Sequence, residues 1–171
     1  MIYFIRHGIT EYNKQKRFQG TLDIPLAKEG IDQANNAAEL LKDVKIDIIY
    51  ASPLSRTMQT AEIINKYHNA KIIKEKALIE FDVGKFVEHK TFDELPKNIY
   101  EMLYSKTNYF GEEDIDNFRK NLFDFLNSLK DKKENILLVS HGGVYTQIYN
   151  SNTGIIMEEE IENCKPVELK F

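Results

Sequence analysis

Short apolar runs alternate with amphipathic helical patterns along most of this chain. The strand-like runs cover residues 2–5, 46–51, 71–73 and 136–139. They are brief and rich in β-branched or aromatic residues, as buried strands are. The helical patterns cover 27–41, a stretch that begins at Ser52-Pro53 as cap and first helical residue, and 115–129. Because strand and helix alternate at least three times, we expect an α/β fold: a three-layer sandwich with a mainly parallel sheet and helices on both faces.

The whole chain fits one domain. A length of 171 residues is ordinary for a single domain, which we predict to span 1–171. A less regular segment at about 81–115 scatters aromatic residues among charges and is interpreted as a small lid or insertion. Residues 166–171 alternate apolar and polar side chains, which indicates an edge strand. Such an edge is able to pair with a second copy, so a homodimer is a possible assembly.

Composition excludes several classes of partner. The net charge is −4 and no long basic run is present, which argues against a nucleic-acid partner. No apolar run approaches the roughly 18 residues of a membrane span, and 2–5 is too short for a signal peptide. A single cysteine, Cys164, cannot complete a Cys-rich zinc cluster. We therefore expect a cytoplasmic protein with no membrane partner.

Polar residues follow each predicted strand directly or after a short segment. Arg6-His7-Gly8 follows the first, Ser52 to Arg56 the second, Glu80 the segment after the third, and His141-Gly142-Gly143 the fourth. In parallel sheets these ends meet at one edge, where ligands bind. Guanidinium groups match phosphate oxygens, imidazole acts as donor or nucleophile, and glycine lets backbone amides approach a ligand. The combination suits a dianionic phosphate group.

Other phosphate chemistries lack their required residues. The only Gly-Lys pair, Gly84-Lys85, has Ile79 where a P-loop needs its first glycine. Cys164 is not followed by a phosphate loop ending in arginine, and Asp114-Ile115-Asp116 begins a polar helix instead of following a strand. Arginines beside the histidines repel a cation, so we expect no metal and no other cofactor.

Four motifs in order along the chain give a family resemblance. They are Arg6-His7-Gly8-Ile9-Thr10-Glu11-Tyr12-Asn13, then Arg17-Phe18-Gln19-Gly20, Ser52 through Ala61, and Ser140-His141-Gly142-Gly143. With them the chain resembles the histidine phosphatase superfamily, the group that includes cofactor-dependent phosphoglycerate mutases. The resemblance covers nearly the whole chain.

The resemblance implies a role for each matching residue. His7 is implied to be a nucleophile that becomes phosphorylated, and Glu80 to be the acid and base. The neighbouring carboxylates Asp82 and Glu88 are alternatives to Glu80. The residues implied to hold the phosphoryl oxygens as catalytic groups are Arg6, Arg56 and His141. Substrate-binding positions are expected at Arg6, Gly8, Asn13, Gln19, Gly20, Arg56 and Gly142.

Three departures from the family pattern fall at the expected rim of the site. Ile9 stands where the family commonly has Glu or Gln, His89 where a glycine falls, and Glu113 where Gly-Glu-Ser ends. They bear on substrate identity more than on mechanism. We expect hydrolysis of a small phosphomonoester, with α-ribazole phosphate or a broad range of metabolites as substrates.

Two alternatives remain open at the level of sequence. One is a mutase, although family mutases are longer and carry a larger insertion around the pocket. The other is a non-catalytic module that binds a phosphorylated ligand, which predicts the loss of a catalytic residue, and none is missing.

Overall fold

A five-stranded sheet forms the centre of the protein. The structure is a computed structural model that describes residues 1–99, 114–155, 157 and 161–170. The strands are β1 Ile2–Arg6, β2 Ile48–Ala51, β3 Lys71–Lys74, β4 Ile136–Ser140 and β5 Val167–Leu169. They are arranged in the order β3-β2-β4-β1-β5. The first four run parallel, and β5 pairs antiparallel with β1 at the sheet edge. The mainly parallel sheet and the terminal edge strand are therefore as predicted.

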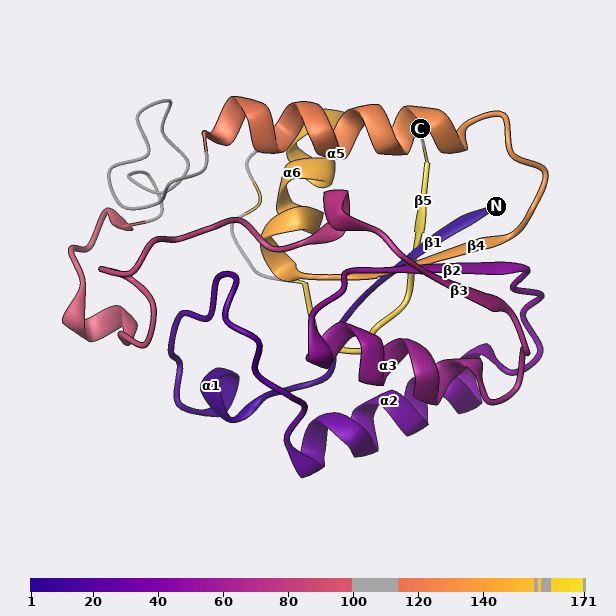
Figure 1. Cartoon of the computed structure of the whole chain (residues 1–171), viewed down its shortest axis with the longest axis horizontal. Coiled ribbons are helices and arrows are strands. Elements are labelled where there is room, and N and C mark those ends of the chain that lie inside the picture. Colours follow the sequence, from indigo (N-terminus) through magenta and orange to yellow (C-terminus); the bar gives the residue numbers. More distant parts are fainter. Residues whose placement is uncertain (100–113, 156, 158–160, 171) are drawn as a thin grey trace.

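Helices cover both faces of this sheet. Helices α2 Lys28–Leu41 and α3 Ser55–Asn65 lie on one face, and α5 Ile115–Leu129 and α6 Gly142–Thr153 lie on the other (Figure 1). A short helix α1, Glu11–Lys14, and the 3₁₀ turns η1 Lys76–Leu78 and η2 Phe92–Glu94 lie in the connections. The three-layer α/β architecture expected from the sequence is confirmed. None of the described helices is both long and apolar enough to cross a bilayer.

Each face has its own apolar core. On the α2 and α3 face, Ala34, Ala37 and Ala38 are fully buried, and their small side chains let the two helices pack closely against each other and the sheet. On the α5 and α6 face, larger residues such as Leu122 and Leu126 fill the space. The buried residues of each helix recur mainly at steps of three and four, which follows the 3.6-residue spacing seen in the sequence.

Strand register brings the predicted site residues together. Arg6 at the end of β1 pairs with Ser140 at the end of β4, and Ala51 of β2 pairs with Val139. Because the strands are parallel and in step, the residues that follow them emerge at the same edge. The backbone N–H of His7 donates to the Ser140 carbonyl at 3.0 Å, which continues the pairing one residue beyond β1.

The predicted start of α3 is wrong by two residues. The helix begins at Ser55 with Leu54 at the N-cap, not at Pro53 with Ser52 as cap. The cap comes from a distant loop, because Asp23 Oδ1 accepts from the Ser55 N–H at 2.6 Å and Oδ2 accepts from the Ser55 hydroxyl at 3.0 Å. An acidic group at this end also complements the helix dipole.

The predicted lid at about 81–115 is only partly within the described residues. Up to Ile99 it holds turns and η2, with a small apolar cluster of Val83, Val87, Leu95 and Ile99. Residues 100–113, including the departure at Glu113, lie outside the described residues. The division into one domain with a lid stays a prediction.

Candidate active site

A cavity of about 270 Å³ lies at the carboxyl end of the sheet. Most of the predicted site residues line it: Arg6, His7, Asn13, Gln19, Gly20, Arg56, Glu80 and Gly142. They come from the ends of β1 and β4, the loop around α1, the first turn of α3 and the segment after η1. The convergence expected from the strand ends therefore holds in the structure.

The imidazole of His7 is held in one orientation. Its Nδ1 lies 2.7 Å from the Gly8 carbonyl oxygen, and because a carbonyl only accepts, Nδ1 carries the proton and Nε2 keeps its lone pair. The Asn163 amide donates to the His7 carbonyl at 2.7 Å. Burial, reinforced by the charges of Arg56 and Arg6, lowers the pKa of His7 well below its ordinary value. This shift favours the neutral imidazole.

Arg56 is a buried cation at the first turn of α3. Its side chain is 1% exposed, and Nη1 and Nη2 donate to the carbonyls of Leu22 at 2.6 Å and Gly20 at 2.9 Å. Within the described part of the chain, its Nε has no hydrogen-bond partner, and no carboxylate lies within ion-pair distance. Burial lowers the pKa of Arg56 to about 10. A buried charge without a paired anion marks a place for an anionic ligand.

Arg6 adds a second cation to the same cavity. Its Nη1 donates to the Ile161 carbonyl at 2.9 Å, which fixes the guanidinium from outside the sheet edge. A side chain at Gly142 would come within 3.3 Å of the Arg6 Cζ atom. Glycine at position 142 therefore lets the start of α6 lie close against the guanidinium.

His141 and Gly8 are not among the lining residues of the cavity. The His141 ring is fully buried with its centroid 5.2 Å from that of His7, and Nε2 lies 2.8 Å from the Ser52 hydroxyl. Burial and the neighbouring cations lower the pKa of His141 well below its ordinary value. Gly8 gives its N–H to the Thr60 hydroxyl at 3.1 Å. That amide is therefore already used inside the protein, and substrate binding at Gly8 stays a prediction.

Glycine is required at position 8 for a different reason. A Cβ on Gly8 would lie 2.4 Å from the Gly30 carbonyl oxygen, and one on Gly30 would lie 2.1 Å from the Ile9 carbonyl oxygen. Both distances are far inside van der Waals contact, so α2 approaches the segment after His7 at backbone distance. The two glycines thus position the end of β1.

Glu80 is the one carboxylate among the described lining residues. Its two oxygens accept separately, Oε1 from the Phe81 N–H at 3.0 Å and Oε2 from the Gly143 N–H in the first turn of α6 at 3.1 Å. Burial raises the pKa of Glu80, although these two amides and the arginines partly oppose the shift. A carboxyl group with a raised pKa is suited to donate a proton and to take one back.

Asn13 and Gln19 are fixed through Thr10. Asn13 Oδ1 accepts from the Thr10 N–H at 3.0 Å as part of the cap of α1, which leaves its amide nitrogen as the donor available to the cavity. The Thr10 hydroxyl also lies 2.9 Å from Gln19 Oε1. Gly20 follows with a φ of +48°, a conformation that favours glycine.

Several lining residues were not predicted. They are Lys16, Arg17, Phe18, Phe81, Val83, Phe92 and Gly143. The signal for the first two was present, since they lie three and two positions before Gln19 of the predicted Gln19-Gly20 pair, but a basic residue in a loop is usually solvated. Of the departures, Ile9 gives its N–H to Gln33 Oε1, and His89 adopts a φ of +69° with Nδ1 bonded to the Tyr12 hydroxyl. The described residues contain no cluster of three or more His, Cys, Asp or Glu side chains able to hold a metal ion.

Comparison with known proteins gives the family. The model of the histidine phosphatase superfamily, branch 1, matches residues 2–171. The chain belongs to this superfamily. The resemblance read from the four motifs is therefore confirmed.

Relatives and solved structures share the fold over most of the chain. PhoE of Bacillus subtilis (strain 168), named an uncharacterized phosphatase, is 33% identical over 153 residues, covering 90% of this chain and 77% of PhoE. Phosphoserine phosphatase 1 of Hydrogenobacter thermophilus is 29% identical over 161 residues, covering 90% and 76%. The crystal structure of phosphoserine phosphatase from Entamoeba histolytica in complex with 3-phosphoglyceric acid matches with a TM-score of 0.79 at 28% identity, covering 96% and 87%.

Proposed function

We propose that this protein is a phosphatase that hydrolyses a small phosphomonoester through a phosphohistidine on His7. The observation that carries the proposal is the state of His7, a neutral imidazole with its Nε2 lone pair unprotonated in a cavity that also holds Arg6 and Arg56. A nucleophile must be deprotonated to attack. Burial and the charges of the two arginines both favour the deprotonated imidazole, and the arginines also attract the phosphate.

The first step transfers the phosphoryl group to the enzyme. His7 Nε2 attacks phosphorus, the N–P bond forms, and the bond to the leaving oxygen breaks. Glu80, whose raised pKa favours the protonated carboxyl group, gives its proton to that oxygen and becomes a carboxylate. Arg6 and Arg56 face the charge that spreads over the phosphoryl oxygens.

The second step returns the enzyme to its starting state. Glu80 takes a proton from a water molecule, the water oxygen attacks phosphorus, and the N–P bond breaks. Inorganic phosphate leaves and His7 is again neutral. One carboxyl group serves both steps, since its two backbone donors hold it in place whichever proton state it has.

His141 completes the oxyanion contacts in this proposal. If the Ser52 hydroxyl donates to Nε2, the His141 proton resides on Nδ1, which has no partner within the described residues. That N–H is then a donor for a phosphoryl oxygen. Ser52 in turn accepts from the Leu54 N–H at 3.5 Å, so its own proton is available for His141.

The substrate class rests on size and charge. A cavity of about 270 Å³ is just below the usual range of small-molecule sites, about 300–1,000 Å³, which favours a small phosphorylated metabolite. Named relatives include phosphoserine phosphatases, and one bound 3-phosphoglyceric acid. Which phosphomonoester is preferred stays a prediction, with α-ribazole phosphate among the candidates.

A substrate panel tests the proposal. Phosphate release is measured from phosphomonoesters and p-nitrophenyl phosphate, with and without EDTA, for the wild type and His7→Ala. We expect turnover that is insensitive to EDTA and absent in His7→Ala. Turnover that survives in His7→Ala contradicts the mechanism, transfer to a second hydroxyl without release indicates a mutase, and binding without either indicates a non-catalytic module.

A further inference from the structure

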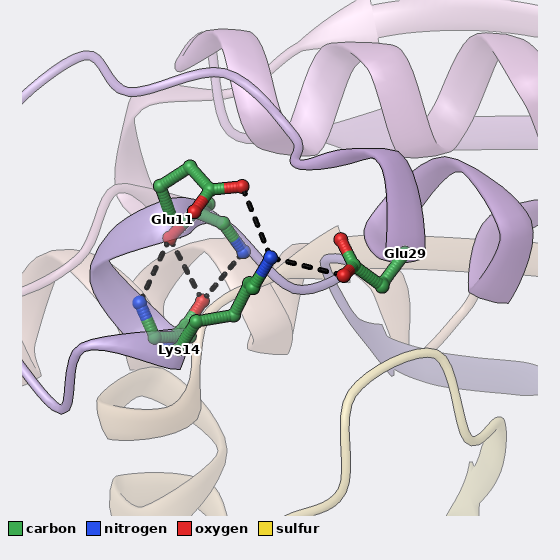
Figure 2. A network of polar contacts seen from close by, with 5 residues as sticks. Glu11, Lys14 and Glu29 are labelled. Atoms are coloured by element: carbon green, nitrogen blue, oxygen red, sulfur yellow. Dashed lines mark hydrogen bonds and ion pairs between the residues drawn. The ribbon is translucent and has the colours of Figure 1, made fainter.

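Three cations between positions 14 and 17 have different surroundings. Lys14 Nζ lies 3.3 Å from Glu11 and 2.9 Å from Glu29, so its charge is paired twice (Figure 2). Arg17 donates from Nε to Gln15 Oε1 at 3.0 Å and lies 3.8 Å from Glu94. Lys16 lines the cavity, and its ammonium has no ion-pair partner in the part of the chain that the structure describes.

The backbone holds Lys16 in an unusual conformation. Its φ is +54°, in the left-handed region where glycine or asparagine is the ordinary choice. The Lys16 N–H donates to the Asn13 carbonyl at 3.0 Å and the Arg17 N–H to the Tyr12 carbonyl at 2.9 Å, which close the turn after α1. This turn ends α1 and places an exposed lysine on the cavity rim.

The charge at this rim exceeds what one phosphoryl group needs. Arg6 and Arg56 already oppose a phosphate dianion inside the cavity. Glu80 does not neutralise Lys16, because its two oxygens accept from backbone amides and burial favours its protonated form. The Lys16 ammonium is therefore available to bind a group of the substrate other than the phosphate.

We propose that Lys16 binds a second anionic group, a carboxylate, on the alcohol portion of the substrate. A single ammonium matches a monoanion, and the small cavity keeps that anion within a few bonds of the phosphate. The rings of Phe18 and Phe92, 4.6 Å apart, flank the same cavity and contact the carbon atoms between the two anions. This assignment rests on the proposed function and makes Lys16 a specificity-determining residue.

The test compares two ligands that differ only in that group. 3-Phosphoglycerate carries a carboxylate where glycerol 3-phosphate carries a hydroxymethyl group. Dissociation constants are measured by calorimetry with the full chain carrying His7→Ala, which leaves the ligands intact, alone and combined with Lys16→Met. Lys14→Met in the same background is the matched control, since it removes an equal charge that is paired away from the cavity.

We expect 3-phosphoglycerate to bind about fivefold more tightly than glycerol 3-phosphate, the scale of one exposed ion pair. Lys16→Met abolishes that preference, Lys14→Met keeps it, and added salt narrows it. Equal affinities for the two ligands, a preference that survives Lys16→Met, or no binding of either ligand overturns the proposal. Failure of the proposed function is distinguishable, because it appears as p-nitrophenyl phosphate hydrolysis retained by His7→Ala.

Discussion

Replacing Arg56 by methionine separates what the buried guanidinium does to folding stability from what it does to catalysis. The guanidinium is 1% exposed, and burial lowers its pKa from 12.5 to about 10. That shift corresponds to about 3 kcal/mol spent on keeping the charge in the folded protein. Methionine is unbranched and apolar and replaces the aliphatic part of the arginine side chain, so Arg56→Met relieves this cost while filling part of the same space.

The relief is opposed by two lost hydrogen bonds. The carbonyls of Gly20 and Leu22 lose their donors, at a cost of about 1–3 kcal/mol each unless water replaces them. The two effects largely offset each other, so we expect the free energy of unfolding to change by no more than about 3 kcal/mol. Loss of one preorganised donor at the transferring group lowers kcat by about 10²–10³-fold.

Urea unfolding measures the free energy of unfolding, and phosphate release from p-nitrophenyl phosphate measures kcat, both on the same protein preparations. Arg119→Met is the matched control, because Arg119 lies on α5 with a partly exposed side chain bonded to Gln147. We expect that control to change neither quantity greatly. A variant Arg56→Met that unfolds while the remaining folded fraction turns over normally refutes the reasoning, since Arg56 is then a structural residue.

Three further outcomes follow from the same structure. Glu80→Gln lowers kcat by about 10²–10⁴-fold with an alkyl phosphate and less with p-nitrophenyl phosphate, whose leaving group needs no proton; equal losses with both count against Glu80 as the acid. Gly30→Ala places a Cβ 2.1 Å from the Ile9 carbonyl oxygen and costs about 1–3 kcal/mol in urea unfolding, with Asn36→Ala on the exposed face of α2 as the control expected to cost nothing. His7 and His141 have lowered pKa values when folded, so the unfolded chain binds more protons below about pH 6.5 and stability falls as pH drops, by up to about 1.4 kcal/mol per pH unit for each histidine. The raised pKa of Glu80 has the opposite effect on stability, which rises as pH drops, so the contribution of one histidine is isolated by mutation. Thermal unfolding of the wild type and of His141→Asn is compared at pH 7 and pH 5. If the pH dependence of stability is the same in both proteins, the lowered pKa of His141 is contradicted.

The fold was predictable because its signals are local. Runs such as 2–5 and 136–139 are apolar throughout, as strands covered on both faces must be, and α2 and α5 show the 3.6-residue spacing of helices with one buried face. Parallel strands then bring His7 and the region of His141 to one edge whatever the details of the loops. The convergence of the central site residues therefore followed from the pattern of parallel strands, and the roles expected for them came from the family resemblance.

The remaining details depend on contacts between distant segments. The start of α3 is set by Asp23, more than thirty positions away in the chain, which no local pattern reveals. The Gly8 amide is used by Thr60, so its availability could not be judged from the motif. Helix α6 was not predicted, since it opens with two glycines and buries few apolar residues. Lys16 was missed because ion pairing cannot be read from the sequence: within the described residues Lys14 has two ion-pair partners and Lys16 has none.

The phosphorylation state of His7 during turnover tests the central claim most directly. The wild type is mixed with a phosphomonoester labelled on phosphorus, quenched in base within milliseconds, and digested for mass spectrometry. We expect a base-stable, acid-labile phosphate on His7 that appears before free phosphate and decays as it is released. Free phosphate that accumulates with no labelled protein at any quench time, or a label on another residue, contradicts the account.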